Sequence, residues 1–73
     1  MTERDSLNAL LARNVRACMW ERHLTQQQLA TRTGVDVRTI RRMLYGHGAT
    51  VEMLDRVAGA LQVEAATLLQ KVA

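Results

Sequence analysis

Proline is absent from this 73-residue chain, and Trp20 and Tyr45 are its only phenyl-type or indole side chains. Cysteine occurs once, at Cys18, which excludes an internal disulfide framework and a zinc site built from several cysteines. No apolar run approaches the length that spans a bilayer, and polar residues interrupt the stretch 7–15, which excludes a signal-peptide core. These absences lead us to expect a small domain of the reducing cytoplasm, without contact with a membrane.

The composition predicts a helical domain. Hydrophobic residues make up 48% of the chain, enough for a core and too much for a disordered segment. β-branched residues never alternate with polar ones over a strand length, whereas leucine and alanine, both strong helix formers, are abundant. We therefore expect one all-α domain over residues 1–73. A chain of this size leaves no room for a ligand-sensing domain, so we expect no cofactor and no small-molecule ligand.

Five helices are predicted, each from a capping residue followed by apolar residues at helical spacing. The first covers about 6–22, with Asp5 or Ser6 as its cap. The second follows Thr25, which fits a capping box with Gln28. The apolar stripe that we expect to face the core from the first helix consists of Leu7, Leu10, Leu11, Val15 and Cys18.

The other three helices are predicted in the same way. The third opens at Asp36 and stops at Gly46, the fourth opens at Thr50, and a fifth starts at about Ala65. The expected core stripe of the fourth helix consists of Leu54, Val57, Ala58 and Leu61. Met53 is expected beside that stripe, not on it.

The second and third predicted helices are short and closely spaced, which is typical of a helix-turn-helix, here over about 25–45. Four residues join them, Thr33-Gly34-Val35-Asp36. Gly34 allows the positive φ that a sharp turn requires. Val35 is expected to turn inward and hold the two helices at a fixed angle.

Arginine dominates the positive charge, since nine of the ten cationic residues are arginine and the net charge is +3. Arginine-rich usage alone also fits a GC-rich genome, so the positions of the arginines carry the argument. Arg38, Arg41 and Arg42 share the side of the third helix that the core does not require. Such a helix fits the major groove of DNA, where guanidinium groups bind guanine edges and phosphates.

Several segments share their order and spacing with one known family, namely 24–30, 34–36, 40–43, Gly46, 51–61, Val63 and 68–69. Together they resemble the XRE family, the helix-turn-helix family of lambdoid phage repressors and Cro proteins, over about 11–69. The resemblance implies a five-helix, lambda-repressor-like fold that binds double-stranded DNA. The chain departs from the family pattern at His23 and Gln62, where the family usually has glycine, and in a shorter loop before the fourth helix.

The resemblance also implies DNA contacts at individual residues. Base-reading positions are matched by Val37, Arg38 and Arg42. Positions expected to reach either a base or a phosphate are Thr39 and Arg41. Phosphate-contacting positions at the start of the second helix and in the loop after the third are matched by Thr25, Gln26 and His47. The family's glutamine at the position of Gln26 also braces the recognition helix, which is the helix that enters the major groove and corresponds here to the third predicted helix.

The expected function is a sequence-specific transcriptional regulator, a repressor that occupies its operator. The alternative from another class is a protein-interaction module or antitoxin that uses the same fold to bind a partner protein. Phage Cro-like repressors, restriction-modification controllers and small antitoxins all fit. No catalytic triad or carboxylate pair emerges, and histidine and cysteine are too few for a metal site, so we expect neither an enzyme nor a metalloprotein.

A symmetric homodimer on a palindromic operator is expected, because one recognition helix reads only about 4–6 base pairs. The dimer interface should consist of apolar residues that are not buried in the core. By analogy with Cro-like relatives we favour a C-terminal set, which consists of Met53, Leu69 and Val72. The second candidate set lies on the first helix and consists of Trp20 and Leu7.

Overall fold

The computed structural model describes residues 2–71, in which four α-helices and one short 3-10 helix follow one another. The elements are α1 (Glu3–Glu21), α2 (Gln26–Thr33), α3 (Val37–Leu44), α4 (Val51–Leu61) and the 3-10 helix η1 (Ala65–Leu69). No strand occurs in this range, so the predicted all-α class is confirmed. The fifth predicted helix is a 3-10 helix and not an α-helix. None of the helices in 2–71 combines the length and apolarity that crossing a membrane requires.

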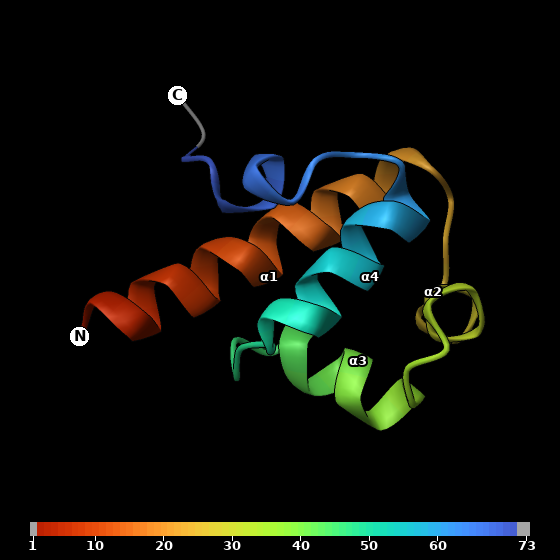
Figure 1. The fold of residues 1–73 in the computed structure, drawn as a ribbon, viewed down its shortest axis with the longest axis horizontal. Coiled ribbons are helices and arrows are strands. Elements are labelled where there is room, and N and C mark those ends of the chain that lie inside the picture. The colour runs from red at the N-terminus through yellow and green to blue at the C-terminus, as the bar shows by residue number, and fades with distance from the viewer. Residues whose placement is uncertain (1, 72–73) are drawn as a thin grey trace.

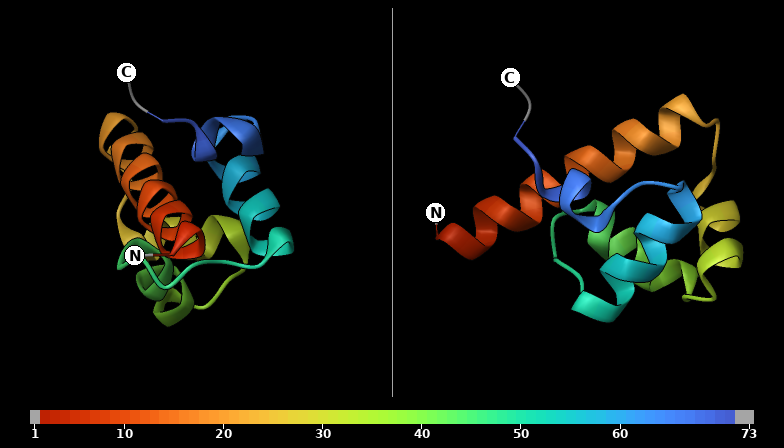
Figure 2. Two further views of the ribbon diagram at one scale, coloured as in Figure 1. Left: turned by 90° about the vertical axis from the view of Figure 1, so that its left-hand side faces the viewer. Right: turned by 45° about the horizontal axis from the view of Figure 1, so that its top comes forward.

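The helices pack in an order that leaves α3 at one edge of the molecule. α1 packs against α3 and η1, while α2 packs against α3 and α4. In Figure 1, α3 lies at the bottom, and η1 and the C-terminal segment lie at the top against α1. The turned view on the left of Figure 2 keeps the same arrangement, so α3 and the C-terminal segment are on opposite sides of the fold.

α1 begins one turn earlier than the sequence predicted. Its N-cap is Thr2, whose hydroxyl accepts a hydrogen bond from the backbone N–H of Asp5 at 3.1 Å. The expected cap at Asp5 or Ser6 is therefore wrong. Asp5 lies instead in the first turn with Glu3, where the helix dipole stabilises acidic side chains.

The core is formed by side chains from every helix and from η1. The largest fully buried side chains are Val15, Leu29, Ile40, Met43, Val57, Leu61 and Leu68. The stripe predicted for α1 is correct at Leu11 and Val15 but wrong at Leu7, which is 44% exposed. The reason is visible in Figure 1, where the first turns of α1 extend past the other helices and have few neighbours to pack against.

The buried side of α4 includes a residue that the sequence analysis placed elsewhere. Met53 is 7% exposed and belongs to the core, whereas Leu54 is only partly buried against it. Met53, Val57 and Leu61 recur every four residues, and this spacing aligns them on one face of the helix. The expectation that Met53 lies beside the core stripe is therefore wrong.

Two helix ends use a left-handed residue that is not glycine. His23 follows α1 with φ 54°, and Gln62 caps α4 with φ 60°. A side chain with a Cβ in this conformation costs roughly 1–2 kcal/mol per residue. These are the two positions at which the resembled family usually has glycine.

The glycines give a matched test of the turn that joins α2 to α3. Gly34 has φ +72°, whereas Gly59 lies inside α4, where an added Cβ meets no atom within 4 Å. Gly34→Ala should lower the free energy of unfolding by about 1–2 kcal/mol, because alanine resists positive φ. Gly59→Ala should raise it by about 0.5–1 kcal/mol, because alanine favours the helix.

Urea denaturation of both variants and the wild-type protein measures these differences. Equal stabilities for the two variants would contradict the left-handed conformation at Gly34.

Candidate nucleic-acid interface

The turn between α2 and α3 is closed by local hydrogen bonds. Gly34 ends α2 in the left-handed conformation. The hydroxyl of Thr33 then accepts a hydrogen bond from the backbone N–H of Val35 at 3.2 Å. Asp36 caps α3 by accepting the backbone N–H of Arg38 at 2.7 Å. Val35 packs partly buried against the core, as predicted, so the angle between the two helices is fixed at the turn.

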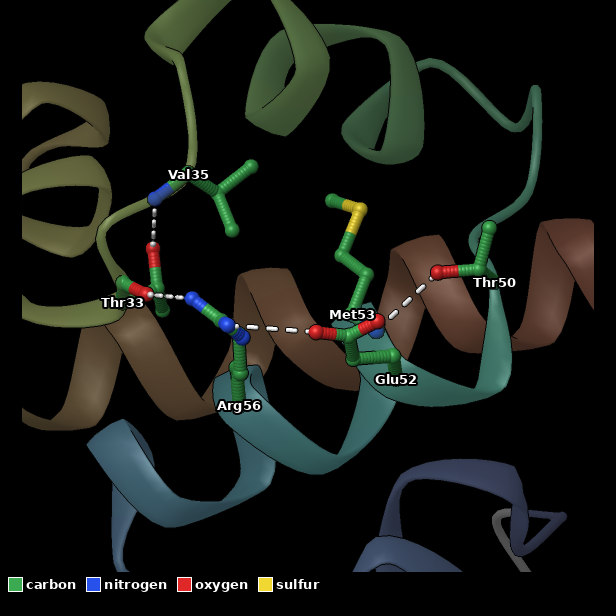
Figure 3. A network of polar contacts seen from close by, with 6 residues as sticks. All are labelled: Thr33, Val35, Thr50, Glu52, Met53 and Arg56. Carbon is green, nitrogen blue, oxygen red and sulfur yellow. Dashed lines mark hydrogen bonds and ion pairs between the residues drawn. The ribbon is translucent and has the colours of Figure 1, made fainter.

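Arg56 of α4 adds a contact to this turn that the sequence analysis missed. Its Nη1 donates to the carbonyl oxygen of Thr33 at 3.4 Å, and its Nη2 donates to Glu52 at 3.1 Å. Figure 3 shows the Arg56 side chain between Glu52 and the end of α2. Because helix C-termini leave carbonyl groups unpaired, this contact stabilises the last turn of α2. The four-residue spacing of Glu52 and Arg56 was the available signal in the sequence.

The end of α3 is held by a second arginine that the sequence analysis missed. Nε and Nη2 of Arg16 in α1 donate to the carbonyl oxygen of Leu44 at 2.9 and 2.7 Å. The Arg16 guanidinium also lies 5.8 Å from the centroid of the Tyr45 ring, within the range of a cation–π interaction. Charge-assisted bonds of this kind are stronger than neutral ones. Arg16 thus holds the C-terminal end of α3, while the hydrogen-bonded turn and the Asp36 cap hold its N-terminal end.

α3 has one buried side and one exposed side, as the sequence predicted. Ile40, Met43 and Leu44 are buried, and the side chains on the other side of the helix are exposed. The exposed residues are Arg38, Thr39, Arg41 and Arg42. Val37, the remaining predicted base-reading residue, is partly buried against the core and offers only part of its side chain.

The three arginines of α3 differ in their partners. Nε of Arg38 lies 3.3 Å from a carboxylate oxygen of Asp36. Nε of Arg41 donates to the side-chain oxygen of Gln26 at 3.3 Å, which joins the start of α2 to the recognition helix. Within residues 2–71, the side chain of Arg42 forms no hydrogen bond or ion pair. Its guanidinium can therefore bind a ligand without first breaking an internal contact.

The first turn of α2 has the predicted capping box. The Thr25 hydroxyl accepts the backbone N–H of Gln28 at 3.1 Å, and the Gln28 side chain accepts the backbone N–H of Thr25 at 2.8 Å. This use of the Thr25 hydroxyl leaves other N–H groups of the first turn without partners in the helix. Such groups, together with the helix dipole, favour an anion at the N-terminus.

His47 lies in the loop between α3 and α4, on the wall of an open hollow of about 680 Å³. The hollow, here called the α1–loop hollow, is lined in part by Arg4, Asn8, Thr39, Arg42 and His47. It brings His47 close to two other predicted contact residues. It also brings in the first turns of α1, which the sequence analysis did not assign to the interface.

The residues predicted for a dimer interface do not form one apolar surface. Met53 is buried, Leu69 is 39% exposed, and Val72 lies outside the described residues. In the second set, Trp20 is 83% exposed and Leu7 is 44% exposed. These two are thirteen positions apart on α1, which corresponds to about 20 Å along the helix, so they are not a cluster.

The chain was compared with protein families, curated proteins and solved structures. A family model described as Helix-turn-helix matches residues 15–68. The match begins within α1 and ends within η1, so it includes the whole of α2, the turn, α3 and α4. No curated protein and no solved structure matches the chain. In the part of the chain that the structure describes, no group of three or more potential ligands is placed to hold a metal ion.

The cap of α3 predicts a measurable pH dependence. The backbone N–H of Arg38, and after it the Arg38 guanidinium, lower the pKa of Asp36 below its ordinary value of 3.8. Because the folded pKa is the lower one, the stabilisation is fully present above the unfolded pKa and is lost as the pH falls through the folded pKa. Asp36→Asn keeps a good cap but removes this titration.

The folded pKa of Asp36 can be measured by NMR titration, and the stability difference between wild type and Asp36→Asn by denaturation at several pH values. We expect the difference in free energy of unfolding between wild type and Asp36→Asn to be constant near neutral pH. In acid, the wild type should lose stability relative to the variant. A folded-state pKa of Asp36 at or above its ordinary value would contradict the capping geometry.

Proposed function

We propose that this chain, which belongs to the XRE family of helix-turn-helix DNA-binding regulators, is a sequence-specific repressor that occupies an operator in double-stranded DNA. The observation that carries the proposal is the exposed face of α3, where Arg42 has no internal partner among the described residues. A solvated surface helix has no need of three arginines on one side. In the major groove the same side chains meet guanine edges and phosphates.

The partners of the α3 arginines suggest how the roles are divided. Arg42 is free to make a bidentate contact with guanine, the commonest specific contact of arginine in the major groove. Arg38 must exchange its contact with Asp36 for a base, while Val37 offers a small apolar surface to a thymine methyl group. Arg41 is directed by Gln26 and is assigned to a base or phosphate beside the start of α2.

Phosphate contacts are assigned to the two ends of this unit. Thr25 and Gln26 lie at the N-terminus of α2, and His47 lies in the loop after α3; these three residues are assigned to phosphates. Thr39 lies between them on the exposed side of α3 and is assigned to a base or phosphate. Phosphate contacts fix the position of the recognition helix, so that the base contacts can discriminate between sequences.

Two features support repression by occupancy of the operator. A helix fixed at both ends loses little conformational freedom when it enters the groove, which favours tight binding. The net charge of +3 favours association with any duplex and makes it salt-dependent. A protein bound across a promoter in this way excludes polymerase from the same DNA.

We further propose that the operator is palindromic and that the chain binds it as a symmetric dimer, because one helix reads too few base pairs for a unique site. With Met53 buried, Leu69 is the exposed member of the C-terminal set among the described residues. Trp20, on α1, offers the other surface. The interface is assigned to the side of η1, which includes Leu69 and lies remote from α3 in Figure 1.

The assignment of Arg42 is tested by Arg42→Ala. An operator is first selected from random DNA, and its affinity is compared with that of a mixed-sequence duplex. The variant should lose about 1–3 kcal/mol of discrimination between the two, the contribution of one bidentate arginine–guanine pair. Its melting temperature should stay at the wild-type value, because the side chain is exposed and makes no internal bond.

Lys71→Ala is the matched control, since it removes one positive charge from the C-terminal segment, which lies on the side of the fold opposite α3 in Figure 1. It should keep the wild-type discrimination. If Arg42→Ala keeps the wild-type ratio of operator affinity to mixed-sequence affinity, Arg42 is not a base-reading residue. If selection enriches no sequence from random DNA, the proposed function itself is wrong.

The dimer is tested by sedimentation and footprinting. We expect a dimer at micromolar concentrations and two protected half-sites whose centres are about 34 Å apart. Leu69→Glu should abolish dimerisation, because it places a charge in an apolar interface. Trp20→Glu should leave it unchanged. The reverse pattern would move the interface to α1, and a monomer that protects a single half-site would overturn the dimer.

A further inference from the structure

We propose that the DNA interface extends beyond the helix-turn-helix to the first turn of α1, where Arg4 binds a phosphate of the DNA backbone. The proposal deepens the proposed function and rests on it. It assigns to Arg4 a contact outside the matched family region, which begins at residue 15. The contact adds affinity for any duplex, because phosphates carry no sequence information.

The position of Arg4 is the first observation. Arg4 lines the α1–loop hollow together with Thr39 and Arg42 of α3 and with His47 of the loop. Thr39 and Arg42 belong to the exposed face of the recognition helix. The hollow is therefore continuous with the surface that enters the groove, and DNA lying on α3 passes over its mouth.

The second observation explains why Arg4 is held there. The cap at Thr2 makes the first turn helical, and Arg4 and Asn8 are four residues apart on one face of α1. Asn8 contacts the loop so closely that a Cβ at Gly48 would lie 2.9 Å from its side-chain oxygen. Gly48 also has φ +89°, which favours glycine. The loop thus contacts α1 one turn away from Arg4. The left view of Figure 2 shows the loop passing below the first turns of α1.

The charges of the α1–loop hollow identify the ligand. Arg4 and Arg42 supply two guanidinium groups, His47 adds an imidazole, and Asp5 contributes the one carboxylate of the lining. Within residues 2–71 neither guanidinium group forms a hydrogen bond or an ion pair. Two like charges at one hollow repel each other in the free protein, and an anion between them relieves this repulsion. The DNA backbone supplies phosphates in a continuous row along the same surface.

A free phosphate ion would use the same chemistry, but the geometry favours the backbone. The hollow is wide and open, so it encloses no small ion, and its walls come from three separate segments of the chain. A phosphate that is already held near α3 by the rest of the duplex needs no enclosure. The contact is therefore assigned to DNA, and free phosphate becomes a competitor in the test.

The experiment measures the affinity for duplex DNA against salt concentration, using fluorescently labelled selected operator and a labelled mixed-sequence duplex. Each phosphate contact contributes about 0.9 to the slope of log K against log salt. Arg4→Gln should reduce the magnitude of the slope by about 0.9 on both duplexes and should weaken both by the same factor. Arg4→Lys should restore the slope, because a phosphate contact requires the charge and not the planar guanidinium group.

Lys71→Gln provides the matched control for net charge and should keep the wild-type slope. Circular dichroism should show the wild-type melting temperature for Arg4→Gln, since the side chain is exposed. Inorganic phosphate, added at constant ionic strength, should not displace the duplex from the wild-type protein.

The possible results separate this inference from the proposed function. A wild-type slope for Arg4→Gln, while the wild type binds its operator, overturns the Arg4 contact alone. If Lys71→Gln decreases the slope as much as Arg4→Gln does, the effect is one of net charge alone, and the Arg4 contact is also overturned. A loss confined to the operator would make Arg4 a base reader, and displacement by inorganic phosphate would make the hollow an ion site. If the wild type binds neither duplex, the proposed function fails and the Arg4 contact fails with it.

Discussion

The attachment of α3 at both ends is the constraint on which the rest of the structure depends. A helix of eight residues is marginal in water by itself, so α3 owes its stability to tertiary contacts. Ile40, Met43 and Leu44 bury its inner side, and Arg16 binds the carbonyl oxygen of Leu44. Arg56 performs the same task at the end of α2. Two arginines thus serve to position the recognition helix, and they leave its outer side to arginines of its own.

The internal contacts of those outer arginines create a hierarchy within one charged surface. Arg38 and Arg41 each contact a side chain at the start of α3 or α2, whereas Arg42 contacts none within residues 2–71. An arginine that must exchange an internal partner for DNA gains less from the new contact than one that is unpaired. Exposed pairs are weak, so the exchange remains possible. Discrimination between sequences is therefore expected to depend most strongly on Arg42.

The loop after α3 connects this surface with the N-terminal end of the chain. A Cβ at Gly48 would lie 2.9 Å from the side-chain oxygen of Asn8, and both residues line one hollow with Arg42 of α3. The consequence is a wider basic surface than the helix-turn-helix alone provides. Arg4 enters it because Thr2 caps α1 and makes its first turn helical.

The sequence by itself determined the features that depend on neighbouring residues. Thr25, Asp36 and Thr50 cap helices within three residues of themselves, and the left-handed turn at Gly34 follows from the same local chemistry. The starts of α2, α3 and α4 and the helix-turn-helix were therefore predictable. The tertiary structure decided the rest. The burial of Met53, the bonds of Arg16 and the place of Arg4 beside Arg42 join residues far apart in the chain. Helical spacing says which residues share a face, but only the packing of one helix against another decides what that face meets.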